Sequence, residues 1–179
     1  VRVGVSAGNS ITSGGNYNVV VGDEAGTALT TGDQNVAVGY QALDALDTAI
    51  RNVAIGTTAL TSDTKGDASV AVGHSALYAQ NFTTTTSVYN VAVGYHAGVN
   101  VTTGLRNTLI GGLAGDALTD ADNNVAVGQA ALSSDTLGSN SVAIGRNALL
   151  TQNFTTATNS YNIAIGSDAG QAITTGTLN

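Results

Sequence analysis

The chain has 179 residues, of which 42% are hydrophobic and 9% charged; its formal net charge is −7, with five Lys or Arg and no Cys. These values exclude a nucleic-acid-binding or anionic-membrane-binding role, because neutralising phosphates requires clustered basic residues. They also exclude a disordered chain, and no apolar run of about eighteen residues is present that could insert into a membrane.

The hydrophobic residues are mostly small or β-branched: Trp and Met are absent, and there are two Phe. A core of ordinary thickness needs larger side chains to fill it, so the composition predicts a thin, layered core. The absence of Cys leaves the redox compartment undefined.

A five-residue phrase of the form Asn/Ser–Val–Ala–Val/Ile–Gly recurs along the chain and predicts a short strand each time, followed by a glycine turn. Counted in sequence positions, the spacings between successive closing glycines are 17, 17, 17 and 21, and the same series then repeats, which gives a superrepeat of four units. The predicted strands and their glycines lie at 18–22, 35–39, 52–56, 69–73, 90–94, 107–111, 124–128, 141–145 and 162–166.

Three residues after each glycine stands an Ala, and the segment beyond it alternates again in several units, as in Thr27-Ala28-Leu29. This pattern predicts a second, weaker strand in each unit. Asp63 and Asp135 occupy a position where other units have Leu, Val or Ile. Because an unpaired buried carboxylate is costly, we expect the strand to break there and the Asp to cap a turn.

Two strands, a glycine turn and a loop at a fixed period predict an all-β fold: a parallel β-solenoid (β-roll) of about nine to ten rungs. The chain is then one domain, residues 1–179, with superrepeats 18–89 and 90–161 and partial repeats 1–17 and 162–179. Nine rungs at about 4.8 Å each would rise roughly 43 Å.

The first residue of each phrase is polar, although an apolar strand follows. Stacked on one another, these side chains can form a hydrogen-bonded ladder along the axis. The ladder residues are Asn18, Asn35, Asn52, Ser69, Asn90, Asn107, Asn124, Ser141 and Asn162.

Within each strand the two β-branched residues share one face and the small middle residue faces the other way. We expect the β-branched face to fill the rung, and the middle residues to form an exposed apolar stripe that packs on copies of the same chain. This predicted oligomer interface consists of Val20, Ala37, Ala54, Ala71, Ala92, Leu109, Ala126, Ala143 and Ala164.

The phrase and its following Ala resemble the head repeats of trimeric autotransporter adhesins, and segments such as Tyr40-Gln41-Ala42-Leu43 and Thr102-Thr103-Gly104 look like repeats of bacteriophage tail-fibre proteins. The resemblance implies a left-handed parallel β-roll in a homotrimer. The adhesin repeat is typically shorter than the unit found in this chain.

The sequence offers no catalytic constellation, so we expect no enzyme, cofactor or metal site. His74 and His96 fall in the variable pair of residues after the glycine, without a nucleophile nearby in sequence. Asp120-Ala121-Asp122-Asn123 lacks the spacing of a calcium loop, and the glycine-rich segments lack that of a phosphate loop.

Every fourth unit carries a loop that is four residues longer, and its aromatic residues are the candidates for binding a sugar or a surface. The alternative, which we favour, is that these rings pack over the rung edges or at the subunit interface. The candidates are Tyr78, Phe82, Tyr89, Phe154 and Tyr161.

These features predict a structural and adhesive segment of an extracellular fibre, from a cell-surface adhesin or a virion tail fibre. Its partners would be its own copies and a host-surface glycan or protein receptor. The sequence stops on the first residue of a further unit without a polar cap, so a second hypothesis is a filament of chains stacked end to end. Ice binding by ranks of Thr is a third, disfavoured because Thr pairs recur mostly at every fourth unit.

Overall fold

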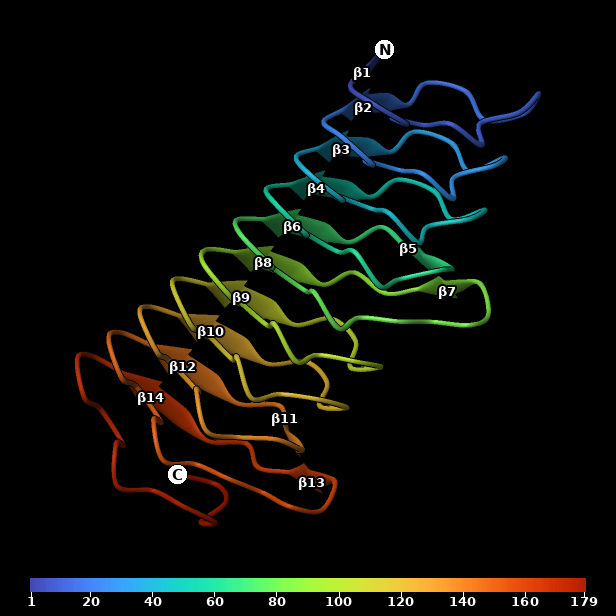
Figure 1. Ribbon diagram of the computed structural model, residues 1–179. Helices are drawn as coiled ribbons and strands as arrows, with labels where there is room; N and C mark the ends of the chain where they lie inside the picture. Colours follow the sequence, from blue (N-terminus) through green and yellow to red (C-terminus); the bar gives the residue numbers. More distant parts are fainter.

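Each phrase forms one three-residue strand, and the strands stack into a parallel β-solenoid of about ten turns without a helix (Figure 1). The computed structural model describes all residues from Val1 to Asn179. The main sheet contains β1 (Arg2–Val3), β2 (Val19–Val21), β3 (Val36–Val38), β4 (Val53–Ile55), β6 (Val70–Val72), β8 (Val91–Val93), β9 (Thr108–Ile110), β10 (Val125–Val127), β12 (Val142–Ile144) and β14 (Ile163–Ile165).

Adjacent strands of this sheet are parallel and in register, so that equivalent residues lie directly above one another. Ala37 pairs with Ala54, and Ala71 pairs with Ala92 across the longer connection. The N-terminal segment also forms a turn, because Arg2 in β1 pairs with Val20. The sequence therefore predicted the solenoid and its stacking correctly.

The expected second strand after each Ala is absent, and this expectation was wrong. That segment is a series of turns, with left-handed residues such as Leu43 (φ 54°) inside it. Backbone hydrogen bonds still join the rungs there, as from the Gly26 N–H to the Ala42 carbonyl at 2.9 Å. Two small sheets occur only at the long loops: β5 (Gly66–Asp67) pairs with β7 (Thr86–Ser87), and β11 (Gly138–Ser139) pairs with β13 (Thr158–Asn159).

The core lies inside each turn and is lined by the middle residue of the strand, the Ala three residues after the glycine, and the next residue, Leu or Gly. Ala54, Ala59 and Leu60 of one rung are all fully buried. The space between the walls of a rung is therefore narrow, and methyl groups on one wall leave room for leucines on the other.

The predicted oligomer interface was therefore wrong. Its residues face the inside of a single coil and are at most 6% exposed, so they cannot contact another chain. The alternation of the strand was correctly recognised, but the two faces were exchanged. The residues concerned are Val20, Ala37, Ala54, Ala71, Ala92, Leu109, Ala126, Ala143 and Ala164.

The first residues of the phrases form a column of hydrogen bonds, in which the amides bond mainly to the backbone of neighbouring rungs and not to one another from phrase to phrase. The Asn35 Oδ1 accepts the Asn52 N–H at 2.9 Å, and the Asn35 Nδ2 donates to the Ala49 carbonyl at 2.9 Å. Asn52, Asn107 and Asn124 repeat this arrangement. Each amide thus satisfies buried backbone groups that a turn would leave unpaired.

Candidate functional site

The outer side of the main sheet is an almost entirely apolar surface, which we call the strand face. The first and third residues of every strand point outward and are only partly covered; Ile55 is 40% exposed and Ile110 is 39% exposed. Of the outward positions in β2 to β14, Thr108 is the single residue that is not Val or Ile. The strand-face residues are Val19, Val21, Val36, Val38, Val53, Ile55, Val70, Val72, Val91, Val93, Thr108, Ile110, Val125, Val127, Val142, Ile144, Ile163 and Ile165.

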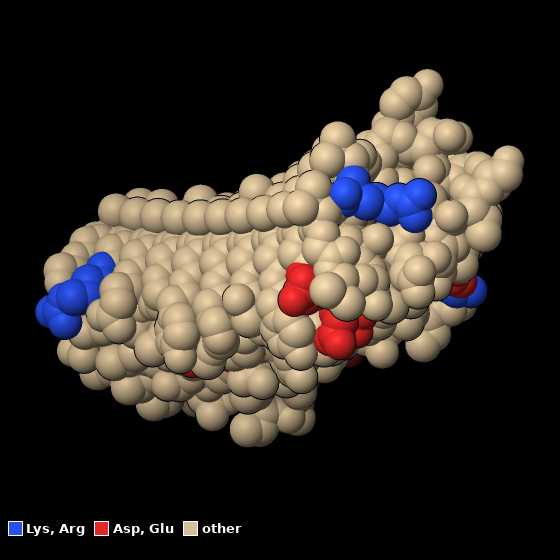
Figure 2. Space-filling model, turned by 45° about the horizontal axis from the view of Figure 1, so that its top comes forward, with Lys and Arg blue, Asp and Glu red and all other residues tan.

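Charged side chains are sparse along the sheet, although Arg51 and Arg106 stand two residues before β4 and β9. On the side of the molecule in Figure 2, a wide, mostly uncharged stretch of surface separates the basic group at the left end from the charged groups that begin near the middle. Apolar contact with another surface would therefore require little desolvation of charge along that stretch.

A column of closing glycines borders the strand face. At Gly128, φ is +135°, and a Cβ atom would lie 2.5 Å from the carbonyl oxygen of Gly145 in the next rung. The close approach requires glycine, because any side chain would collide with backbone. The other glycines of this column, from Gly4 to Gly145, meet the next rung in the same way.

The two residues after each glycine form the post-glycine corner, which protrudes from the rung. The second residue of each pair adopts left-handed backbone, for example Thr58 and His96 with φ of 53° and 55°. None of these residues belongs to the core cluster inside the rungs, which explains why the sequence varies here. The pairs are Asp23-Glu24, Tyr40-Gln41, Thr57-Thr58, His74-Ser75, Tyr95-His96, Gly112-Leu113, Gln129-Ala130, Arg146-Asn147 and Ser167-Asp168.

Three rings from two successive corners contact one another. Tyr95 stacks on His96 with ring centroids 3.9 Å apart and 10° between the planes. His74, from the preceding rung, lies 5.5 Å from Tyr95 and 5.4 Å from His96. The sequence placed both His in the variable pair, but only the stacking of the rungs shows that they meet beside a Tyr.

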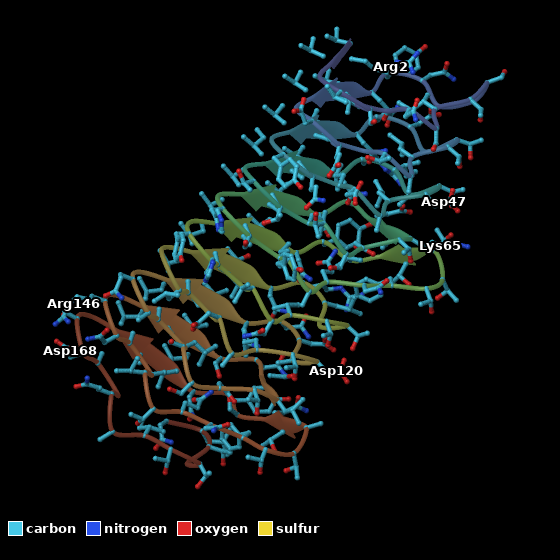
Figure 3. The ribbon with its side chains drawn as sticks, in the orientation of Figure 1. Arg2, Asp47, Lys65, Asp120, Arg146 and Asp168 are labelled. Atoms are coloured by element: carbon cyan, nitrogen blue, oxygen red, sulfur yellow. The ribbon has the colours of Figure 1, made fainter.

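Electrostatics at the corner change along the solenoid. The negative charge of Glu24 is the main cause that raises the pKa of Tyr40, with smaller effects from burial, Asp44 and Asp23. At the opposite end, hydrogen bonds from Asn147 and Ser167 lower the pKa of Asp168, and Arg146 adds to this effect. Figure 3 shows Arg146 and Asp168 side by side at this edge, and their Nη2 and Oδ2 atoms are 2.7 Å apart.

A buried polar cluster lies beneath the first long loop, between the rung that contains Asp63 and the next rung, which contains Gln80 and Phe82. Asp63 is fully buried and accepts hydrogen bonds from the Gly66 N–H, the Phe82 N–H and the Gln80 Nε2, the last at 2.5 Å. Gln80 also donates to the Ser69 Oγ at 3.0 Å. The Asp does cap a turn, as expected, but it points into the core with three donors compensating its charge.

The same cluster recurs one superrepeat later, with Asp135, Gln152 and Ser141 in equivalent contacts. In both copies Ser replaces Asn in the ladder. The Gln side chain reaches into this position and accepts a hydrogen bond from the next ladder residue, Asn90 or Asn162. The sequence offered a signal for this cluster in the shared spacing of Ser, Gln and Asp.

The aromatic candidates divide into two groups. Phe82 and Phe154 are 8% and 6% exposed, so they are not available for surface binding, and for these two rings the structure shows packing over the rung, the favoured alternative. Their rings cover the buried cluster, as Phe154 Cδ2 close to Gly138 illustrates. Tyr78, Tyr89 and Tyr161 are 43%, 56% and 52% exposed, and they stack on no other aromatic ring.

The acidic segment after Leu118 serves hydrogen bonding between rungs. Asp120 Oδ1 accepts from the Thr103 hydroxyl at 2.5 Å, and Asp122 Oδ1 accepts from the Leu105 N–H at 2.7 Å. Nowhere do three His, Asp or Glu side chains gather as a metal site would require. No helix of the chain has the length and apolarity needed to cross a membrane.

Comparison with known proteins finds no matching family model, no similar curated protein and no similar solved structure.

Proposed function

We propose that this chain is a structural and adhesive segment of an extracellular fibre, assembled as a homotrimer through the strand face. The observation that supports this proposal is the continuous outward stripe of Val and Ile, which runs the length of the sheet and is only partly covered in a single chain.

The size of the stripe argues for a permanent partner. Nine strands at about 4.8 Å give a surface roughly 43 Å long, and soluble monomers rarely leave contiguous apolar patches of such extent exposed. Burial of β-branched side chains against an equally apolar surface would stabilise the assembly by roughly 25 cal/mol per Å².

A second copy of this chain fits the stripe better than an unrelated protein does. The outward side chains repeat at the strand spacing, since equivalent residues such as Val36 and Val53 are paired in register. Another copy carries ridges with the same repeat, so the two surfaces can interdigitate along their whole length. A globular partner would match this repeat over only a few rungs.

The number of chains comes from the resemblance to adhesin head repeats and tail-fibre repeats. Three parallel solenoids around one axis would give a slender rod with every strand face inward. The lateral loops and corners would face outward, where a host-surface receptor can be bound.

Light scattering coupled to size-exclusion chromatography tests the proposal. The wild-type chain is expected to have the mass of three chains. Val72→Lys combined with Val127→Lys should yield single chains, because lysine heads cannot be buried at the centre of the face. Thr84→Lys, in an exposed loop, is the matched control and should leave the mass unchanged. A monomeric wild-type chain would overturn the proposal.

A further inference from the structure

The two superrepeats copy one another closely in their cores but not at the post-glycine corner. One superrepeat further along the chain, Tyr40-Gln41 is replaced by Gly112-Leu113, and Tyr95-His96 by Ser167-Asp168. No corner pair shares a residue with its counterpart. Functional side chains that occur in only one of the two superrepeats are therefore found at this corner.

We propose that the ring cluster of His74, Tyr95 and His96 is a binding site for neutral carbohydrate. The inference goes beyond the fibre role, since the site is complete within one chain and does not require assembly through the strand face.

The ring of Tyr95 is fixed yet accessible. Its stacking on His96 at 3.9 Å holds its orientation, while Tyr95 remains 57% exposed. The next corner begins with Gly112, where an added Cβ atom would meet only the Tyr95 carbonyl oxygen, at 3.9 Å. No side chain at that position covers the ring, and a ring that is already ordered loses little conformational entropy on binding.

Hydrogen-bonding groups of both kinds adjoin the rings. The Ser75 Oγ, in a side chain only 7% exposed, lies 3.1 Å from His74 Nδ1 and 2.9 Å from the Thr58 Oγ1, so this chain of bonds fixes the His74 ring, whose other nitrogen makes no hydrogen bond within the chain. Hydroxyl oxygens both donate and accept, and an imidazole offers one donor and one acceptor. A pyranose presents the complementary surface: an apolar C–H face for the ring, and hydroxyls around its rim.

Negative charge gathers at the first corners of the solenoid, away from the ring cluster. Asp23 and Glu24 occupy the corner of the first complete rung, and with Asp44 they raise the pKa of Tyr40 on the neighbouring corner. They lie three to four rungs, about 14 to 19 Å, from the three rings and are screened there, so the preference for a neutral ligand comes from the rings and the polar groups beside them.

Saturation-transfer NMR with three probes tests the site: the methyl glycosides of glucose, galactose and mannose. At least one is expected to receive saturation at its ring hydrogens. Tyr95→Ser with His96→Asp introduces the residues found at 167 and 168, which the fold already accepts. This variant should weaken binding at least about ten-fold. Tyr161→Ser, which removes a comparably exposed Tyr just before β14 and outside the corners, should leave binding unchanged.

A transfer of the cluster supplies the converse experiment. Arg146→His, Ser167→Tyr and Asp168→His place the three rings at the equivalent corner of the second superrepeat and should raise the stoichiometry from one sugar to two per chain. Light scattering on each variant should show an unchanged mass. The proposal is overturned if no glycoside receives saturation, if the Tyr95/His96 variant binds as well as the wild type, or if Tyr161→Ser loses as much binding.

Discussion

The interior of the solenoid and its post-glycine corner obey opposite rules. Inside, every rung repeats Ala, or a residue whose volume is compensated on the facing wall, at fixed positions. The two walls of a rung are only as far apart as an Ala methyl group and a Leu side chain require, so a change in side-chain volume is not tolerated. At the corner, nine pairs show nine different sequences, since none of these residues belongs to the core cluster inside the rungs. The frame is thus specified by packing, and recognition chemistry is free to accumulate where packing makes no demand.

Gly111 and Gly112 lie at the boundary between the interior and the corner, and their substitution should give the largest difference in stability between the two regions. Gly111→Ala should destabilise the chain by more than about 4 kcal/mol, because its Cβ would lie 2.5 Å from the Gly128 carbonyl oxygen at φ +133°. Gly112→Ala, whose Cβ meets one atom at 3.9 Å, should leave stability unchanged. Chemical denaturation measures both. Equal destabilisation would show that the corner is as constrained as the frame.

The buried polar cluster is the next most sensitive part of the interior. Asp63→Ala leaves the Gly66 and Phe82 N–H groups and the Gln80 amide without their acceptor, at a cost of about 3 kcal/mol. Asp120→Ala, which removes an exposed carboxylate with a single hydroxyl donor, is the control and should cost about 1 kcal/mol or less. Denaturation midpoints distinguish them; an unaffected Asp63 variant would mean that water satisfies these donors.

Volume compensation across the rung gives a smaller effect. Where the strand carries Leu109, the opposite wall has Gly115, and a Cβ there would lie 2.7 Å from the leucine. Other rungs combine Ala126 with Leu132, both fully buried. Gly115→Leu alone should destabilise by about 2 kcal/mol through overpacking, and adding Leu109→Ala should recover most of it. A double-mutant cycle by denaturation tests this; additive losses would contradict compensation.

This compensation also explains what the sequence could and could not predict. The regular spacings of the closing glycines determine a stacked solenoid, and the alternation in Val36-Ala37-Val38 determines two faces. Alternation does not say which face is inside. Val and Ile are the usual core residues, so the pattern predicts them inside the rung, whereas the narrow interior takes the middle residue of the strand, which is usually Ala.

A signal for the correct assignment is nevertheless present in the sequence. Val20 and Leu109, the two large residues at the middle strand position, are each followed six residues later by glycine. Most rungs with Ala in that place have Leu there instead. When one position is large only where the other is small, the two side chains fill the same space. This covariation therefore identifies the middle strand position as internal. The ring cluster had no such signal, because contacts between corners depend on left-handed backbone that spacing does not show.

The mildest perturbation concerns Tyr40 at the corner. Glu24 disfavours its phenolate, so the folded-state pKa is above the ordinary value of about 10. As pH rises, Tyr40 therefore loses its phenolic proton in the unfolded chain before it does so in the folded chain. The contribution of Tyr40 to the free energy of unfolding is fully present below about pH 10 and is lost as the pH rises through the folded-state pKa. Glu24→Gln should lower the pKa of Tyr40 toward its ordinary value, whereas Glu24→Asp should retain part of the shift. Ultraviolet difference titration of phenolate absorbance follows this, with Tyr40→Phe identifying the signal. If the pKa of Tyr40 were the same in the Glu24→Gln variant, side chains at neighbouring corners would not affect one another, unlike side chains at neighbouring core positions.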